Sequence, residues 1–211
     1  MDTDLIAALA ATDDSIRLKA ALEIGSNPNP GVLDTLVARC AVEPNFYVRD
    51  MLTWALTRLP PQVTVPRLLE ELQSQRAQAR SQALHTLSKI KDPSAWPAIT
   101  QSLLRDRDDE VARSAWRAAV VLVPKGQEKG LAEELAAQLG RGNREVQLSL
   151  SRALLALGED VIGPILRQAM ASESPIVRAH ASATDRLLRE PDVAFELAVD
   201  DAKRIFALGK D

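Results

Sequence analysis

The chain has 211 residues, of which 46% are hydrophobic but only 3% aromatic, and its formal net charge is −3. The apolar content is mainly alanine, leucine and valine, which favours closely packed helices over β-sheet. The acidic balance argues against a general polyanion binder, and no run approaches the ~18 apolar residues of a membrane span.

A short pattern recurs six times along the chain: an apolar residue, usually followed by a basic or polar residue, with a small or apolar residue four positions on. The apolar anchors are Ile16, Val48, Ala79, Val111, Val146 and Val177, and they are separated by 32, 31, 32, 35 and 31 residues. Pro66, Pro97 and Pro164 each precede one of these anchors by about 13 residues. Proline suits the first turn of a helix. The spacing therefore predicts a repeated pair of helices, called here A and B.

Turn-forming residues separate the predicted helices and give the limits of each repeat. In chain order we expect repeats at 2–26, 30–59, 61–91, 94–122, 126–157 and 160–190, followed by a C-terminal capping helix at 191–208. A single helix pair cannot bury its apolar face, so neighbouring pairs must stack. The sequence predicts an all-α, right-handed α-solenoid that forms one domain over 1–211.

The start of helix B resembles a known repeat motif. Asp14-Ser15-Ile16-Arg17 has the form Asp-x-Val-Arg, and Asn45 to Arg49 and Ser174 to Arg178 are similar. Together with the helix A prolines, these segments resemble the HEAT repeat family, including the HEAT-like repeats of small bacterial proteins. The resemblance covers nearly the whole chain, although Ala112 and Gln147 replace the arginine. It implies that the B helices line a concave surface.

The six B segments carry an excess of positive charge in an acidic chain. Their net charge is +6, whereas the whole chain carries −3. Four of the arginines that contribute to this positive charge have two possible roles. They could bind the neighbouring turns as a structural ladder, or they could face a ligand; they are Arg17, Arg49, Arg80 and Arg178. The sequence therefore predicts a relatively basic concave groove, in which these four arginines are not assigned a role.

Two positions of helix B, one turn apart, are polar, aromatic or basic in the middle repeats and mostly apolar or alanine in the outer ones. We predict that they form a binding site, because Trp and Arg dominate binding hot spots. The other interpretation is that Trp54 covers the junction between two repeats and that the arginines are solvated. Trp116 and His180 each lie one position away from the Trp54 column, so Trp116 either rims the groove or packs at a junction, and His180 is expected to be partly exposed. The predicted site comprises Asp50, Trp54, Arg58, Ser81, His85, Arg113, Arg117 and Arg152.

The favoured function is a non-catalytic adaptor or scaffold that binds a protein or an acidic peptide in this groove. The alternatives are a nucleic-acid-binding protein such as the HEAT-like alkylpurine DNA glycosylases, or a binder of an anionic small ligand. Phycobilin lyases share HEAT-like repeats, but no residue-level match extends beyond the repeat. Ser81 and His85 could suggest a hydrolase, but the sequence lacks a nucleophile-elbow motif.

No cofactor or metal site is predicted, because the two histidines lie about three repeats apart and metal sites need clustered ligands. The single cysteine, Cys40, cannot form an internal disulfide, which fits a reducing compartment. The acidic start MDTDLIAALA is unlike the basic start of a signal peptide. We therefore expect a cytoplasmic protein without membrane contact, whose oligomeric state the sequence leaves open.

Overall fold

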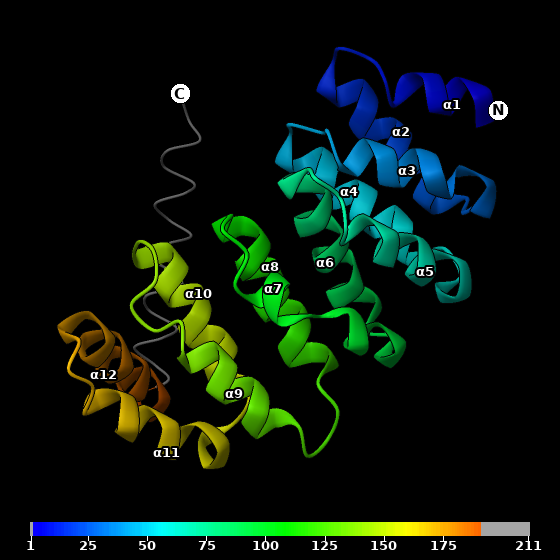
Figure 1. Cartoon of the computed structure of the whole chain (residues 1–211). Helices are drawn as coiled ribbons and strands as arrows, with labels where there is room; N and C mark the ends of the chain where they lie inside the picture. Colours follow the sequence, from blue (N-terminus) through cyan, green and yellow to red (C-terminus); the bar gives the residue numbers. More distant parts are fainter. Residues whose placement is uncertain (1, 191–211) are drawn as a thin grey trace. The chain divides into compact units, whose positions relative to one another are not determined.

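The structure is a computed structural model that describes residues 2–190, and these residues form helices and no strands (Figure 1). The α-helices are α1 (Asp2–Ala8), α2 (Asp14–Ser26), α3 (Leu33–Cys40), α4 (Phe46–Thr57), α5 (Pro61–Glu71), α6 (Ala77–Ile90), α7 (Gln101–Leu104), α8 (Asp109–Leu122), α9 (Glu128–Ala136), α10 (Arg144–Leu155), α11 (Glu159–Met170) and α12 (Pro175–Arg189). Two 3₁₀ segments, η1 (Pro30–Val32) and η2 (Pro93–Ala98), precede α3 and α7. The predicted all-α fold of six helix pairs is confirmed, while the predicted capping helix at 191–208 lies outside the described residues.

The chain divides into two compact units, Met1–Gln127 (unit 1) and Glu128–Asp211 (unit 2). In unit 1 the B helices contact one another in chain order, α2 with α4, α4 with α6 and α6 with α8. The A helices cover them from the other side, with α3 on α4, α5 on α6 and α7 on α8. In unit 2, α10 contacts α12, and α9 and α11 contact each other. The prediction of a single domain over 1–211 stays a prediction.

Three of the B helices, α4, α8 and α10, begin at a side-chain cap followed by a buried anchor. Asn45 accepts hydrogen bonds from the backbone N–H groups of Tyr47 and Val48, and Asp108 and Asn143 cap α8 and α10 in the same way. The anchors that follow, Val48, Val111 and Val146, are at most 3% exposed. A cap satisfies the free N–H groups of the first turn, so the cap and the anchor together favour these starting points for the three helices.

Two of the three prolines that recur before the anchors, Pro66 and Pro164, lie inside A helices and not in their first turns, and the third, Pro97, lies in η2. Pro66 lies within α5 and Pro164 within α11, and each helix begins five residues earlier than the proline. In the fourth repeat, Pro93 and Pro97 both fall in η2, and only the four residues of α7 continue as α-helix. Proline removes a backbone donor and clashes with the preceding turn, which explains why this A helix is broken.

Four arginines of the B helices bind the turn that precedes their own helix. Each donates from Nη1 to carbonyl oxygens five or six residues earlier: Arg17 to Ala11 and Thr12, Arg49 to Glu43 and Pro44, Arg80 to Ser74, and Arg178 to Ser172 and Glu173. Gln147, which replaces the arginine in the fifth repeat, reaches Gly142 O at 3.3 Å. These residues therefore form the ladder, and we name the four side chains the ladder arginines.

Replacing a ladder arginine with methionine is expected to destabilise the fold. In Arg178→Met, the carbonyls of Ser172 and Glu173 each lose a donor that lies at 2.7 Å. Hydrogen bonds to charged groups contribute about 1.5–3 kcal/mol each, so partial solvation predicts a loss of about 1–2 kcal/mol in urea unfolding. The matched control is Arg186→Met on the same helix, because Arg186 is 70% exposed and its ion pair is with Glu190, which is itself exposed. Equal losses in the two variants would contradict the ladder's role.

Candidate functional site

The B helices of unit 1 present one exposed row of side chains that crosses four repeats. Leu22, Trp54, His85 and Arg117 occupy equivalent positions of α2, α4, α6 and α8, and we call them the central row. These helices contact one another in that order, so the four side chains are successive neighbours. The row contains three of the predicted site residues.

Trp54 rests on the neighbouring repeat at Gly25. A Cβ atom added to Gly25 would lie 2.5 Å from Cε3 of Trp54 and even closer to Cζ3. The indole therefore touches the backbone of α2, in the space that a larger residue would occupy. Trp54 nevertheless keeps 38% of its surface exposed. Both interpretations of this residue hold in part, because the ring packs at a repeat junction and still presents an aromatic surface.

His85 and Arg117 meet at the other end of the central row. Nδ1 of His85 lies 3.1 Å from Nη1 of Arg117. Arginine can only donate, so Nδ1 accepts and the imidazole proton resides on Nε2. Burial lowers the pKa of His85 to about 4, the nearby charges of Arg117 and Lys89 add to this, and Asp50 opposes them. At neutral pH the His85 imidazole is therefore uncharged, and the hydrogen bond that it accepts orients the exposed Arg117 guanidinium.

The His85 imidazole should titrate with a midpoint near pH 4 in an NMR pH series, well below its ordinary value of 6.5. Arg117→Gln should raise the midpoint while leaving it below 6.5, because burial remains the larger cause. His85→Asn assigns the resonances, since the chain has two histidines, and Lys19→Gln on α2, two B helices away in unit 1, is the charge control. A wild-type midpoint near 6.5, or no response to Arg117→Gln, would contradict the contact.

The flanking positions add charge on both sides of the central row. Asp50 is exposed one turn before Trp54, and Arg58 is exposed one turn after it. Lys89, which the sequence prediction missed, is exposed one turn after His85 on α6. Its signal was available, because Lys89 aligns with Arg58 in the repeat. The cations Arg58, Lys89 and Arg117 therefore lie on three successive B helices.

Three other predicted residues are placed differently. Ser81 is 6% exposed and donates its hydroxyl to the Gln78 carbonyl at 3.1 Å, so it is part of the helix packing. Arg113 pairs with Glu110 at 2.6 Å on its own helix. Arg152 is exposed on α10 and belongs to unit 2, whereas the central row belongs to unit 1. Within unit 1, the structure thus brings together Asp50, Trp54, Arg58, His85 and Arg117.

Trp116 belongs to the core and does not rim the surface. It is 0% exposed, and its indole N–H donates to the Leu104 carbonyl at 2.8 Å. A shift of one residue turns a helical position by about 100°. This rotation separates the buried Trp116 from the exposed Arg117.

His180 was predicted to be partly exposed, and the structure shows it 4% exposed in unit 2. Its Nδ1 accepts from Gly140 N at 2.9 Å, so Nε2 carries the proton and faces Ser151 Oγ at 3.0 Å and Gln147 O at 2.9 Å. Thr184 donates to the His180 carbonyl, so Ser151 directs its own proton to Thr184 at 2.7 Å. Ser151 therefore accepts from His180, which is the reverse of the direction that a serine nucleophile needs.

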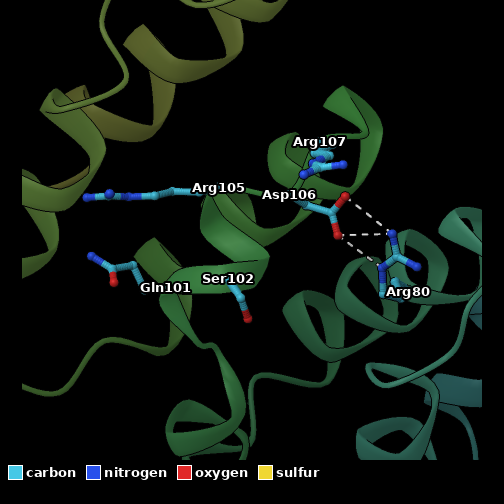
Figure 2. A pocket seen from close by; sticks show the side chains of 6 residues that line it. All are labelled: Arg80, Gln101, Ser102, Arg105, Asp106 and Arg107. Atoms are coloured by element: carbon cyan, nitrogen blue, oxygen red, sulfur yellow. Dashed lines mark hydrogen bonds and ion pairs between the residues drawn. The ribbon is translucent and has the colours of Figure 1, made fainter.

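An open depression of about 560 Å³ lies beside the loop before α8, lined by Arg80, Gln101, Ser102, Arg105, Asp106 and Arg107 (Figure 2). Its basic composition suggests an anion site, but one of its arginines is already engaged with the only carboxylate of the lining. Arg80 pairs with Asp106 at 3.0 Å and donates to Ser74 O. The guanidinium groups of Arg105 and Arg80 lie at opposite ends of the depression in Figure 2. The depression therefore lacks a converging set of donors.

Among residues 2–190, no group of three or more His, Cys, Asp or Glu side chains has a geometry suited to a metal ion. Cys40 is buried, and this burial raises the pKa of its thiol to about 12, so the thiol is protonated and unreactive. None of the described helices combines the length and the apolar character that crossing a bilayer requires.

Comparison with known proteins agrees with this fold. Residues 34–120 match the family model of HEAT repeats. No curated protein sequence matches the chain. The complex of CpcE and CpcF of phycocyanin lyase from Nostoc sp. PCC7120 aligns with a TM-score of 0.50 and 22% identity, over 87% of this chain and 75% of that chain.

The crystal structure of an engineered protein aligns with a TM-score of 0.48 and 20% identity, over 89% of this chain and 96% of that chain. At such identities, a likeness of structure concerns the fold and not the activity. The predicted family is confirmed by the match to the family model. The chain is a helical-repeat protein whose residues 34–120 match the HEAT repeat family.

Proposed function

We propose that this chain is a non-catalytic interaction module, and that the B-helix face of unit 1 binds an acidic segment of a protein partner. The observation that carries the proposal is the exposed Trp54 on Gly25, with Arg58, Lys89 and Arg117 on successive helices beside it. Aromatic residues and arginine dominate the energetics of protein interfaces. The family match supports an interaction role, since HEAT arrays mostly bind other proteins.

The absence of a catalytic role is part of the same proposal. Ser81 and His85 share α6, but the Ser81 hydroxyl donates to a backbone carbonyl and Nδ1 of His85 accepts from Arg117. Ser151 and His180 are both buried, and their hydrogen bond runs in the unproductive direction. These contacts favour structural roles for the serine–histidine pairs of the described residues. The likeness to the phycocyanin lyase complex is a likeness of fold.

The test is a selection of displayed random 12-residue peptides against the full chain, followed by binding measurements on the selected peptides. We expect acidic peptides that bind the wild type and lose affinity at least tenfold for Arg58→Glu/Lys89→Glu/Arg117→Glu. The matched control is Arg76→Glu/Arg107→Glu/Lys125→Glu, which reverses three exposed charges of unit 1 outside the central row and its flanking positions. Circular dichroism checks that both variants fold.

Equal binding to both charge-reversed variants, or a selection without acidic enrichment, would overturn the proposal. The nucleic-acid alternative is tested in parallel with labelled duplex DNA and single-stranded RNA. Tight binding that falls steeply with salt concentration, and that the Arg58/Lys89/Arg117 variant abolishes, would replace the peptide with a nucleic acid. We propose that this interaction takes place in the cytoplasm, and that it needs neither a cofactor nor contact with a membrane.

A further inference from the structure

The central row changes its chemical character from one end to the other. Leu22 on α2 is 47% exposed and Trp54 on α4 is 38% exposed, so two large apolar side chains face solvent in adjacent repeats. The next position holds the neutral His85, and the last holds Arg117. The row therefore has an apolar end and a cationic end, and a ligand that spans it must match both.

Gly25 determines the apolar end. It lies one turn after Leu22 on α2, so the two positions share a helix face and are about 5–6 Å apart. Because Trp54 rests on the Gly25 backbone, its indole lies on α2 within one helical turn of the Leu22 position. Alanine at position 25 would place a methyl group 2.5 Å from Trp54 Cε3 and force the ring away. We call this surface the Leu22–Trp54 shelf.

The distances between the shelf and the cations follow from the helix packing. Packed helices lie about 8–10 Å apart, so Lys89 on α6 is about one helix spacing from Trp54 and Arg117 on α8 about two. An extended chain advances about 3.3 Å per residue. Two helix spacings therefore correspond to about six residues of an extended ligand, and one spacing to about three.

We propose that the partner segment is an extended peptide with one large apolar residue on the Leu22–Trp54 shelf and acidic residues about three and about six positions from it. The nearer acid pairs with Arg58 or Lys89, and the farther acid pairs with Arg117. Gly25 is a positioning residue in this arrangement, since it acts through Trp54. The inference rests on the proposed function and specifies the motif that the face reads.

The experiment measures fluorescence anisotropy of dye-labelled 12-residue peptides with the full chain. One peptide has leucine and two glutamates at +3 and +6, a second has the glutamates at −3 and −6, and a third has them at +1 and +2. A fourth replaces the leucine of the +3/+6 peptide with serine. We expect one of the first two to bind about tenfold more tightly than the last two, because the third cannot place both acids on the cations and the fourth has no apolar side chain to bury on the shelf.

Gly25→Ala should reduce the affinity for the matched leucine peptide to that of the serine peptide and leave the serine peptide unaffected. The matched control is Gly130→Ala in α9, where an added Cβ meets no atom within 4 Å. Leu22→Ala removes the other apolar side chain of the shelf and leaves the contact between Gly25 and Trp54 unchanged. Unchanged leucine-peptide affinity in both Gly25→Ala and Leu22→Ala would overturn the shelf.

The outcomes separate this inference from the proposed function. If the serine peptide binds as tightly as the leucine peptide and both depend on Arg58, Lys89 and Arg117, the acidic partner stands and the shelf is wrong. If longer helix-forming peptides with acids about seven and about thirteen positions from leucine, measured in the same assay, bind best, the ligand is helical, because a helix advances 1.5 Å per residue, and the extended motif is wrong. If no acidic peptide binds, both proposals fail.

Discussion

Replacing Glu43 with alanine should lower the free energy of unfolding by about 3–5 kcal/mol, the usual effect of leaving a buried charge without its partner. The Glu43 carboxylate is 0% exposed. It accepts from Arg17 through Nε and Nη2, both at 2.8 Å, from Arg39 Nε at 2.8 Å and from Asn45 N at 2.9 Å. Arg17 is itself 5% exposed, so the substitution leaves a guanidinium inside the junction of the first two repeats.

Urea unfolding measures this loss, and Glu70→Ala is the matched control because that carboxylate is 72% exposed and pairs with Arg67 at 3.5 Å. A control loss below about 0.5 kcal/mol is expected for a surface position. Similar losses of unfolding free energy for both variants would show that the buried Glu43 carboxylate and its arginine partners contribute no more stability than a surface ion pair.

The same cluster predicts a loss of stability in acid. Burial alone would raise the pKa of Glu43, but hydrogen bonds from Arg17, Asn45 and Arg39 outweigh it and lower the pKa from 4.5 to about 2. The folded state therefore binds this proton less readily than the unfolded state. The stabilisation is complete above about pH 4.5 and is lost as the pH falls from there towards 2. Glu43→Gln should flatten this part of the stability profile.

Trp116→Ala should cost about 3–5 kcal/mol, because it leaves a large cavity in the core. Trp116 is the largest fully buried side chain of the described residues, and its N–H is bonded to the Leu104 carbonyl. The substitution removes both the packing and the hydrogen bond that the indole N–H donates to the Leu104 carbonyl. Urea unfolding of the full chain is again the measurement.

Trp54→Ala is the natural comparison, since it removes the same kind of side chain from a partly exposed position on α4. Because Trp54 remains 38% exposed, its loss should cost well below half as much stability as that of Trp116 while weakening ligand binding. Trp116→Phe should recover most of the lost stability by refilling the cavity. Equal destabilisation by the two alanine variants would mean that Trp54 is a core residue and would remove the anchor of the proposed interface.

The repeat was predictable from the sequence because its signal is periodic. Apolar anchors about one repeat apart, turn residues between them and a recurring helix start determine six helix pairs, and the structure places them within a few residues of the predicted limits. The same alignment correctly put Trp54, His85 and Arg117 in one row. It could not resolve Trp116, because deciding between core and surface needs the rotation of α8 about its axis.

The two contacts with the greatest consequences were not predictable. Gly25 carries no side chain and gives no hydrophobic signal, so its role as the seat of Trp54 depends on how closely α2 approaches α4. Glu43 resembles an ordinary turn residue before Pro44, and its partner Arg17 lies 26 positions earlier. Contacts between repeats depend on the packing of the helices, which the periodicity of a single repeat does not specify.

The ladder arginines also have a consequence for the order in which this protein folds. Their bonds join residues five or six positions apart, so each loop can close within its own helix pair and at little entropic cost. The Arg17–Glu43 bond spans 26 residues and can form only when two pairs have already met. Proteins dominated by local contacts fold fast, and a repeat array can nucleate at any of its units. Loop closure by the ladder therefore precedes stacking, and the buried Glu43 cluster joins repeats that are already formed.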